Sequence, residues 1–322
     1  MACDDWYLTR DLDEFLARAG EFLRSRPDRH TVHLTVTENL RARGGRTYGD
    51  GAPEFGVLEG AAARTGTRGV RAAFFRTPPH PLVLTPLTEA EADALAACLA
   101  GPEREGTAGA GGSGGVEGPA GAEGPAGTGG LSGVNADQDT AAAFAAAWHR
   151  RTGARTSLRR RMRLYRLGGL TVPRPAPPGR ARVAGPADRG LLARWYTDFC
   201  AAVGETAVRD PRDWAEEHAG SGAVTFWETP DGTPVSMAGR SPVVAGQVRV
   251  TAVHTPEHLR GRGYAGAVTA EVSRVAVESG AAEVLLFTDL ANPTSNGLYQ
   301  RIGYRPVSDF AVYGFRPAAP AP

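Results

Sequence analysis

The stretch "TAVHTPEHLRGRGYAGAVTAEVSRVAVESG", Thr251–Gly280, decides the fold of this chain. An apolar strand passes through a proline turn into "RGRG", and a helical pattern with Val268 and Val272 on one face follows directly. The glycines therefore stand where the first N–H groups of a helix lack an intrahelical partner. Such a helix N-terminus binds anions, and Arg260 or Arg262 would add favourable charge, so phosphate is the expected ligand.

The glycine loop alone does not separate a phosphate site from an ordinary strand-to-helix turn. It lacks the "GxxxxGK(S/T)" pattern of a P-loop, which a chain without lysine cannot supply. It also lacks the "GxGxxG" fingerprint of dinucleotide-binding folds. The sequence downstream has to decide between the two interpretations.

A second motif follows the helix. The run "EVLLFTD" is typical of a central strand, and it leads into "LANPTSNGLYQRIGY", residues 290–304. There Asn292 stands at the start of a short helix, which Gly303 ends. The two motifs therefore alternate strand, helix, strand and helix in a fixed order.

This combination resembles the GCN5-related N-acetyltransferase superfamily, whose R/QxxGxG/A loop binds the pyrophosphate of acetyl-CoA. Here the loop is formed by Arg260, Gly263 and Ala265, and the "LYxRIGY" ending matches as well. The resemblance covers about residues 180–315. It includes the helix-helix-strand-strand-strand order that we expect from Asp188 onward.

The resemblance implies an α/β (α+β) fold of two similar domains, each with a mixed, mostly antiparallel central sheet flanked by helices. The proline-rich Thr171–Arg182 indicates an extended connector between them. We expect a first domain at 1–178 and a catalytic domain at 179–316, followed by a tail at 317–322. The first domain resembles the degenerate partner of tandem members, because it lacks an RxxGxA loop.

Within the first domain, residues 101–133 contain almost no large apolar side chains, which predicts a flexible Gly-rich surface insertion. Helical spacing occurs at 12–23 and 140–150, and a helix capped by Thr88 follows the strand patterns "VRAAFFRT" and "PLVLTPL". The stretch "HTVHLTVTENL", residues 30–40, alternates like a half-buried strand.

The arginine-rich "SLRRRMRLYRL", residues 157–167, also alternates. Arg161 and Arg163 are set against Met162 and Leu164, which favours a strand with one solvated face over nucleic-acid binding.

The resemblance implies that acetyl-CoA is the acyl donor and that its pantetheine arm lies between the strand before the loop and "VLLFTD". A bulge in that strand, around Val253–Thr255, would offer a backbone N–H to the oxyanion. The residues implied in binding acetyl-CoA are Val253, His254, Thr255, Arg260, Gly261, Arg262, Gly263, Tyr264, Ala265, Asn292, Ser295, Asn296 and Tyr299.

The resemblance places a tyrosine general acid at Tyr299, next to the departing sulfur; the alternative is a core aromatic. The general base stays open between Glu205, Glu228 and His254, and histidine has the most suitable reference pKa, about 6.5. Asn292 and Asn296 fit both a cofactor contact and a helix cap.

Composition limits the remaining possibilities. The formal net charge is +1, so nothing in the balance indicates a nucleic-acid or membrane partner, and no apolar stretch is long enough for a membrane span. Three distant cysteines support neither a disulfide framework nor a metal site, which predicts a cytoplasmic protein without a metal.

The leading hypothesis is an acetyl-CoA-dependent N-acetyltransferase that acts on the primary amine of a small molecule or an amino terminus. Two alternatives stay open: a non-catalytic CoA-binding sensor or assembly module, and a transferase of a longer acyl group. The first domain would cover the acceptor cleft or mediate self-association as a homodimer.

Overall fold

The computed structural model describes residues 6–61, 68–101, 130–204 and 210–318. Most of the Gly-rich insertion and the candidate base Glu205 lie outside these ranges. The end of the expected insertion belongs to the fold, because Leu131 is buried and Gly133 begins a strand.

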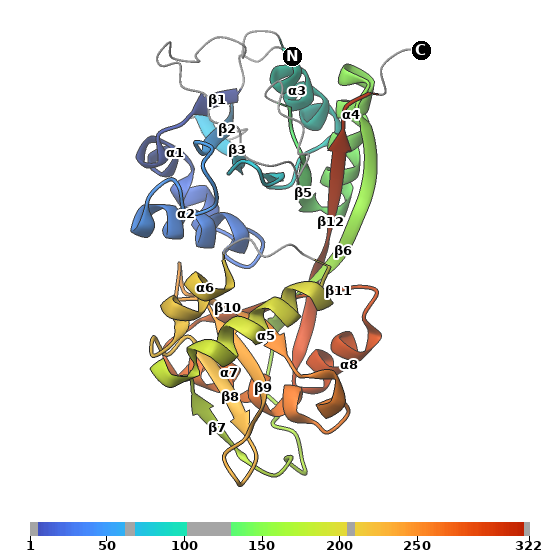
Figure 1. Ribbon diagram of the computed structural model, residues 1–322. Coiled ribbons are helices and arrows are strands. Elements are labelled where there is room, and N and C mark those ends of the chain that lie inside the picture. Colours follow the sequence, from blue (N-terminus) through green and yellow to red (C-terminus); the bar gives the residue numbers. More distant parts are fainter. Residues whose placement is uncertain (1–5, 62–67, 102–129, 205–209, 319–322) are drawn as a thin grey trace, which may run out of the picture.

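The described residues of the first half of the chain form ten elements, shown in Figure 1. They are β1 (Trp6–Thr9), α1 (Leu12–Arg24), α2 (Thr31–Arg43), β2 (Glu54–Ala61), β3 (Arg68–Arg76), β4 (Leu82–Leu84), α3 (Glu89–Ala100), β5 (Gly133–Asp137), α4 (Gln138–Thr152) and β6 (Arg155–Leu167).

The second half follows the predicted order of elements, two helices and then three strands before the glycine loop. It comprises β7 (Arg180–Val183), α5 (Arg189–Ala202), α6 (Pro211–His218), β8 (Val224–Glu228), β9 (Pro234–Arg240), β10 (Gln247–His254), α7 (Tyr264–Glu278), β11 (Glu283–Asp289), α8 (Pro293–Arg301) and β12 (Tyr304–Arg316).

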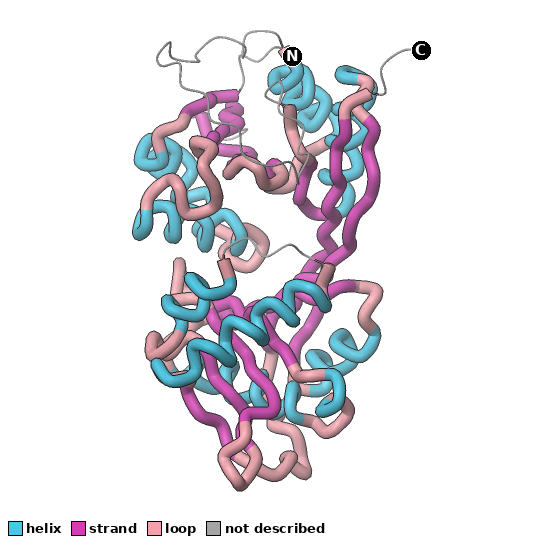
Figure 2. The backbone as a smooth tube through the Cα atoms, in the orientation of Figure 1, coloured by secondary structure: helices cyan, strands magenta, loops and turns pink. Residues whose placement is uncertain are grey.

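All the described strands belong to one mixed, mostly antiparallel sheet in the order β1-β2-β3-β4-β5-β12-β6-β11-β10-β9-β8-β7. The sheet spans two lobes: the first lobe holds β1–β5 and α1–α4, and the second holds β7–β11 and α5–α8. The long strands β6 and β12 run from one lobe into the other, as Figures 1 and 2 show. One end of β12 pairs with β5 through Phe310–Gly314, whereas Met162–Arg166 of β6 pairs with β11. The two lobes are therefore joined by a shared sheet as well as by the connector.

The helix α2 corrects one prediction, because the alternating residues 30–40 form a helix and not a strand. Two threonines that suggested a strand return their hydroxyls to the helix: Thr35 Oγ1 donates to the Thr31 carbonyl (2.7 Å) and Thr37 Oγ1 to the His33 carbonyl (2.8 Å). Leu34 and Leu40 pack in the core that α1 forms with β2 and β3. Tertiary packing thus outweighs the β propensity of these residues.

The same helix buries a histidine that makes stability depend on pH. His33 is 3% exposed and its Nε2 has no hydrogen-bond partner among the described residues. Burial, assisted by His30, lowers the pKa of His33 to about 3. An unfolded histidine titrates near 6.5, so below that pH the unfolded chain binds one more proton than the folded chain. Folding stability contributed by neutral His33 is therefore lost as pH falls from about 6.5 toward 3.

We expect His33→Leu to flatten this dependence. Between pH 7 and pH 5 the wild-type free energy of unfolding should fall by about 2 kcal/mol more than that of the variant. Urea unfolding of both proteins at the two pH values measures the difference. Equal losses would show that His33 does not carry the effect.

Cys98 in α3 corrects a second expectation. It is disulfide-bonded, whereas Cys200 is a buried residue of α5. The expectation from sequence spacing is wrong here, because cysteines far apart in the sequence can be adjacent in the fold. Among the described helices, none has the length and hydropathy that crossing a membrane requires.

Candidate functional site

The site begins where two parallel strands of the second lobe separate. β10 and β11 pair from Gln247 with Glu283 to Val250 with Leu286, and the pairing stops there although both strands continue. Beyond these residues the sheet opens between Thr251–His254 and Phe287–Asp289. Backbone groups that face such an opening can pair with an extended ligand instead of a strand.

A β-bulge accompanies this opening. In the β9–β10 pair, Thr251 lies opposite Gly239 and His254 opposite Met237, so two residues of β10 stand against one residue of β9. One of the two, Ala252, has a φ of 48°, a left-handed conformation that is strained for alanine. The bulge therefore lies at Ala252–Val253, one residue before the predicted position, and it releases backbone groups from the ladder.

The glycine loop follows with the geometry of an anion cradle. Gly261 and Gly263 have φ values of 78° and 84°, and α7 begins directly after Gly263. The first intrahelical bond runs from the Ala267 N–H to the Gly263 carbonyl (3.1 Å), so the three preceding amides lie before the ladder. A Cβ added at Gly263 would find only Pro177, at 3.9 Å, so space for a phosphate is open. The loop therefore fits a pyrophosphate.

Two side chains brace this loop. Arg260 Nε donates to the Thr255 carbonyl (3.2 Å), and Arg262 Nη2 donates to the His258 carbonyl (3.3 Å). Both arginines are exposed. The pair Tyr264 and Ala265 forms the first turn of α7.

Tyr299 stands on α8 between the core and the opening. Its ring packs 6.5 Å from that of Tyr165 and 6.1 Å from that of Tyr304, centroid to centroid. Burial raises the pKa of Tyr299 to about 12, so the phenol is protonated at neutral pH and can donate a hydrogen bond. Tyr299 is therefore a buried core aromatic that also keeps a hydroxyl able to donate a hydrogen bond, so the two interpretations of this residue do not exclude each other.

The two asparagines of the motif fix α8. Asn292 caps the helix by accepting from the Ser295 N–H (3.0 Å). Asn296 donates to the Asp289 carbonyl (2.8 Å) and accepts from the Tyr165 hydroxyl (2.9 Å). These bonds hold α8 against β11 and β6, and thereby position Tyr299.

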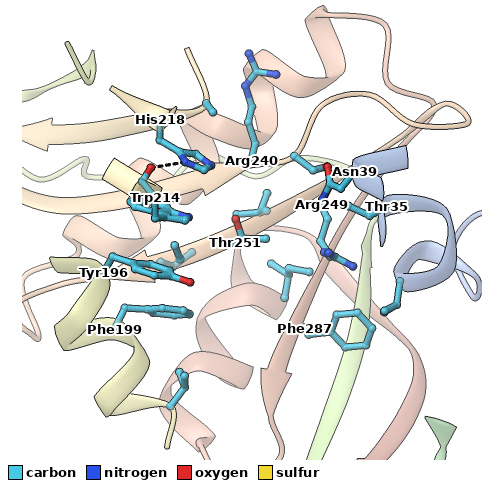
Figure 3. Close-up of a pocket in the computed structure, with 18 of the residues that line it drawn as sticks. Thr35, Asn39, Tyr196, Phe199, Trp214, His218, Arg240, Arg249, Thr251 and Phe287 are labelled. Carbon is cyan, nitrogen blue, oxygen red and sulfur yellow. Dashed lines mark hydrogen bonds between the residues drawn. The ribbon is translucent and has the colours of Figure 1, made fainter. Parts of the chain in front are cut away.

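A cavity of about 870 Å³ opens beside these elements (Figure 3). Val253 and Tyr299 line it, and Tyr196, Phe199 and Trp214 from α5 and α6 form an aromatic wall. Residues of α2 also line it, so both halves of the chain contribute. A buried bond between them, from Thr31 Oγ1 to Gln247 Oε1 (2.9 Å), fixes α2 on the start of β10.

His254 does not line this cavity. Its side chain is buried 5.7 Å from the Trp195 ring, centroid to centroid, and burial lowers its pKa. The histidine is therefore neutral at pH 7 but faces α5. Glu228 is also turned away from the cavity, because it pairs with Arg182.

The comparisons with known proteins agree with this geometry. Residues 244–311, from just before β10 into β12, match the family model described as FR47-like protein. A solved structure from Sphaerobacter thermophilus, titled GCN5-related N-acetyltransferase, covers 100% of this chain and 98% of its own, with 14% identity and a TM-score of 0.57. The chain therefore contains an FR47-like segment and shares the full-length fold of this structure.

Two further structures share the full-length fold of this chain. A Drosophila protein covers 98% of this chain and 99% of its own at 13% identity, with a TM-score of 0.57. A structure from Colwellia psychrerythraea, titled acetyltransferase from GNAT family, covers 97% and 99% at 10% identity, with a TM-score of 0.53. No curated protein sequence matches the chain. Since these likenesses extend over both halves, the tandem architecture belongs to the shared fold.

Sequence reasoning missed the residues that the superfamily motifs do not contain. Asn39 and Thr35 reach the cavity from α2, a segment assigned to a strand. Arg249 lies in the otherwise apolar run "VRVTAV" and also lines the cavity. A charged residue inside a central strand is the signal that could have indicated it.

Proposed function

We propose that the protein is an acyl-CoA-dependent N-acyltransferase that moves an acetyl group from acetyl-CoA to a primary amine. Members of the superfamily generally bind acyl-CoA. The observation that carries the proposal is the presence of three features in one part of the chain: the separated strands, the glycine loop that follows β10, and a cavity lined by Tyr299 and by residues of both strands. Each feature corresponds to one part of the reaction, namely the pantetheine, the pyrophosphate and the acyl transfer.

In the proposed reaction the loop amides and Arg260 or Arg262 hold the pyrophosphate. The N–H groups released at the bulge donate to the thioester carbonyl as the amine nitrogen attacks its carbon and negative charge builds on the oxygen. The carbon–sulfur bond then breaks, and its electron pair stays on sulfur. Tyr299 donates a hydrogen bond to the sulfur. The amine gives up its proton to solvent or a base, and this proton then returns to the thiolate to form the free thiol.

A phenol with a pKa near 12 is a weaker acid than a thiol, whose reference value is about 8.5. Tyr299 therefore stabilises the developing thiolate chiefly as a hydrogen-bond donor in a dry site. His254 and Glu228 do not line the cavity, which disfavours both as the general base. Glu205 remains a candidate.

We expect Tyr299→Phe to keep acetyl-CoA affinity within about threefold and to lower kcat by about a hundredfold, the usual contribution of a positioned proton donor. Calorimetry with acetyl-CoA and thiol release in the presence of an amine measure the two quantities. The matched control is Tyr304→Phe, which removes a buried hydroxyl bonded to Ser273 Oγ (2.7 Å) outside the cavity lining. Equal rates for Tyr299→Phe and the wild type would remove Tyr299 from this role.

A further inference from the structure

Arg249 is a charged side chain in the lining of the cavity, and it forms no ion pair with any residue that the structure describes. Its backbone is fixed to Ser241, whose hydroxyl accepts from the Arg249 N–H (2.9 Å). Figure 3 shows the guanidinium projecting into the cavity beside Phe287, with Thr35 and Asn39 of α2 nearby. Among the described residues, no carboxylate lies within 4.0 Å of it.

Two other part-buried arginines are neutralised by carboxylates. Arg163 makes a two-pronged contact with Asp309 (2.6 and 2.8 Å), and Arg182 contacts Asp188 (2.7 Å) and Glu228. Burial lowers the pKa of Arg249, which reflects the cost of surrounding a cation with protein. A position that costs stability without a compensating contact is typical of a ligand site.

The described residues that line the cavity carry an excess of positive charge. They include four arginines and two acids, which gives a difference of two positive charges. One acid, Glu217, is paired with Arg43, and the other, Asp289, accepts from the Ala291 N–H (2.7 Å). An anionic group entering the cavity would therefore meet a favourable field.

We propose that the amine acceptor of this enzyme carries a carboxylate, and that Arg249 binds it. The inference rests on the proposed acyl transfer and names the chemical class of its acceptor. Arg249 acts as a specificity residue: it pairs with the carboxylate through two parallel N–H···O bonds, while the amine points toward the bulge.

The first half of the chain supplies a second donor. Asn39 Nδ2 donates to the Tyr48 hydroxyl (2.7 Å), which leaves the phenolic proton of Tyr48 for a ligand oxygen. Tyr48 lines the cavity and interacts electrostatically with Arg249. α2 and the loop after it thus complete the carboxylate site, which gives the first half a role in acceptor selection.

The strand also sets the length of the acceptor. Arg249 precedes Val253 by four residues, about 13 Å along an extended strand. The arginine side chain bridges only part of this distance, so the amine and the carboxylate are separated by several bonds. An ω-amino acid or a dipeptide fits this spacing, with its apolar part between Phe287 and the aromatic wall, whereas glycine is too short.

Thiol release from acetyl-CoA with matched acceptors tests the proposal. In the wild type we expect kcat/KM for 6-aminohexanoate to exceed that for hexylamine, which lacks only the carboxylate, and also that for glycine. Arg249→Met should lower kcat/KM for 6-aminohexanoate at least about thirtyfold and leave hexylamine unchanged, because one partner of a desolvated charge pair is removed. The exposed Arg155→Met on β6 serves as the control and should change neither.

Equal wild-type rates with 6-aminohexanoate and hexylamine would overturn the proposal. An equal loss of kcat/KM on both acceptors in Arg249→Met would also overturn it.

Two readouts separate a failure of the carboxylate site from a failure of the proposed acyl transfer. The variant should bind acetyl-CoA as the wild type does and keep or raise Tm, since an uncompensated charge is removed; a lowered Tm with general loss would mean a structural role. If no amine releases thiol, calorimetry with hexanoate still decides: wild-type binding that Arg249→Met abolishes supports the carboxylate site, and equal heats contradict it.

Discussion

Gly263→Glu should abolish measurable binding of acetyl-CoA. The substitution places a carboxylate at the N-terminus of α7, in the space that is open to a phosphate. It also forces a side chain into a φ of 84°, which costs about 1–2 kcal/mol for a residue with a Cβ. Repulsion between the carboxylate and the pyrophosphate adds to this strain, so we expect calorimetry to show at least a hundredfold loss of affinity.

Two controls separate charge from strain. Gly263→Gln has the same size and backbone strain without the charge, and it should retain more affinity than Gly263→Glu. Gly232→Glu places the same residue at a φ of 87° in the β8–β9 turn, where the added Cβ also meets open space. That variant should lose similar stability and still bind acetyl-CoA. Normal binding by Gly263→Glu would remove the phosphate from this loop.

Gly303→Ala should produce a large loss of stability in the second lobe. Gly303 has a φ of 105°, and an added Cβ would lie 1.9 Å from the Gly169 carbonyl oxygen. The connector would have to move, which breaks two bonds: Gly168 N–H to the Gly303 carbonyl (3.0 Å) and Thr171 N–H to the Ile302 carbonyl (3.0 Å). Strain of about 1–2 kcal/mol and about 1 kcal/mol for each hydrogen bond give an expected loss of about 3–4 kcal/mol.

Gly280→Ala is the matched control for this change. Gly280 has a φ of 86° after α7, and an added Cβ would meet nothing within 4 Å. It should therefore lose only the strain energy. Urea unfolding of both variants measures the difference, and equal losses would show that the contact with the connector is unimportant. Because Gly303 directly follows the segment that holds Tyr299, the first variant should also lower turnover.

Most of the second lobe was predictable from the sequence because its signals are local. Asn292 caps a helix where predicted, and the glycines of the "RGRG" loop take the left-handed conformations that only glycine adopts without strain. Thr88 likewise forms the complete capping box with Glu91. Such features depend on a few neighbouring residues, so the sequence alone contains the information.

Features that depend on distant contacts were not predictable. The segment at 31–43 has the composition of a strand and becomes a helix because α1 and the sheet bury it. β6 pairs with β11, and β12 pairs with β5, so residues more than a hundred positions apart become neighbours in the sheet. Arg249 becomes a candidate binding residue only because it lines a cavity to which α2 also contributes. A motif can locate a phosphate loop, but the acceptor side arises from the assembly of both halves.

The central claim is that the opening between β10 and β11, with the glycine loop at its end, binds acyl-CoA for transfer to an amine. Calorimetric titration of the full chain with acetyl-CoA, followed by thiol release upon addition of 6-aminohexanoate, tests it most directly. We expect saturable binding of one acetyl-CoA per chain and release of one thiol for each amine acylated. The absence of any binding of acetyl-CoA to the folded protein would contradict it.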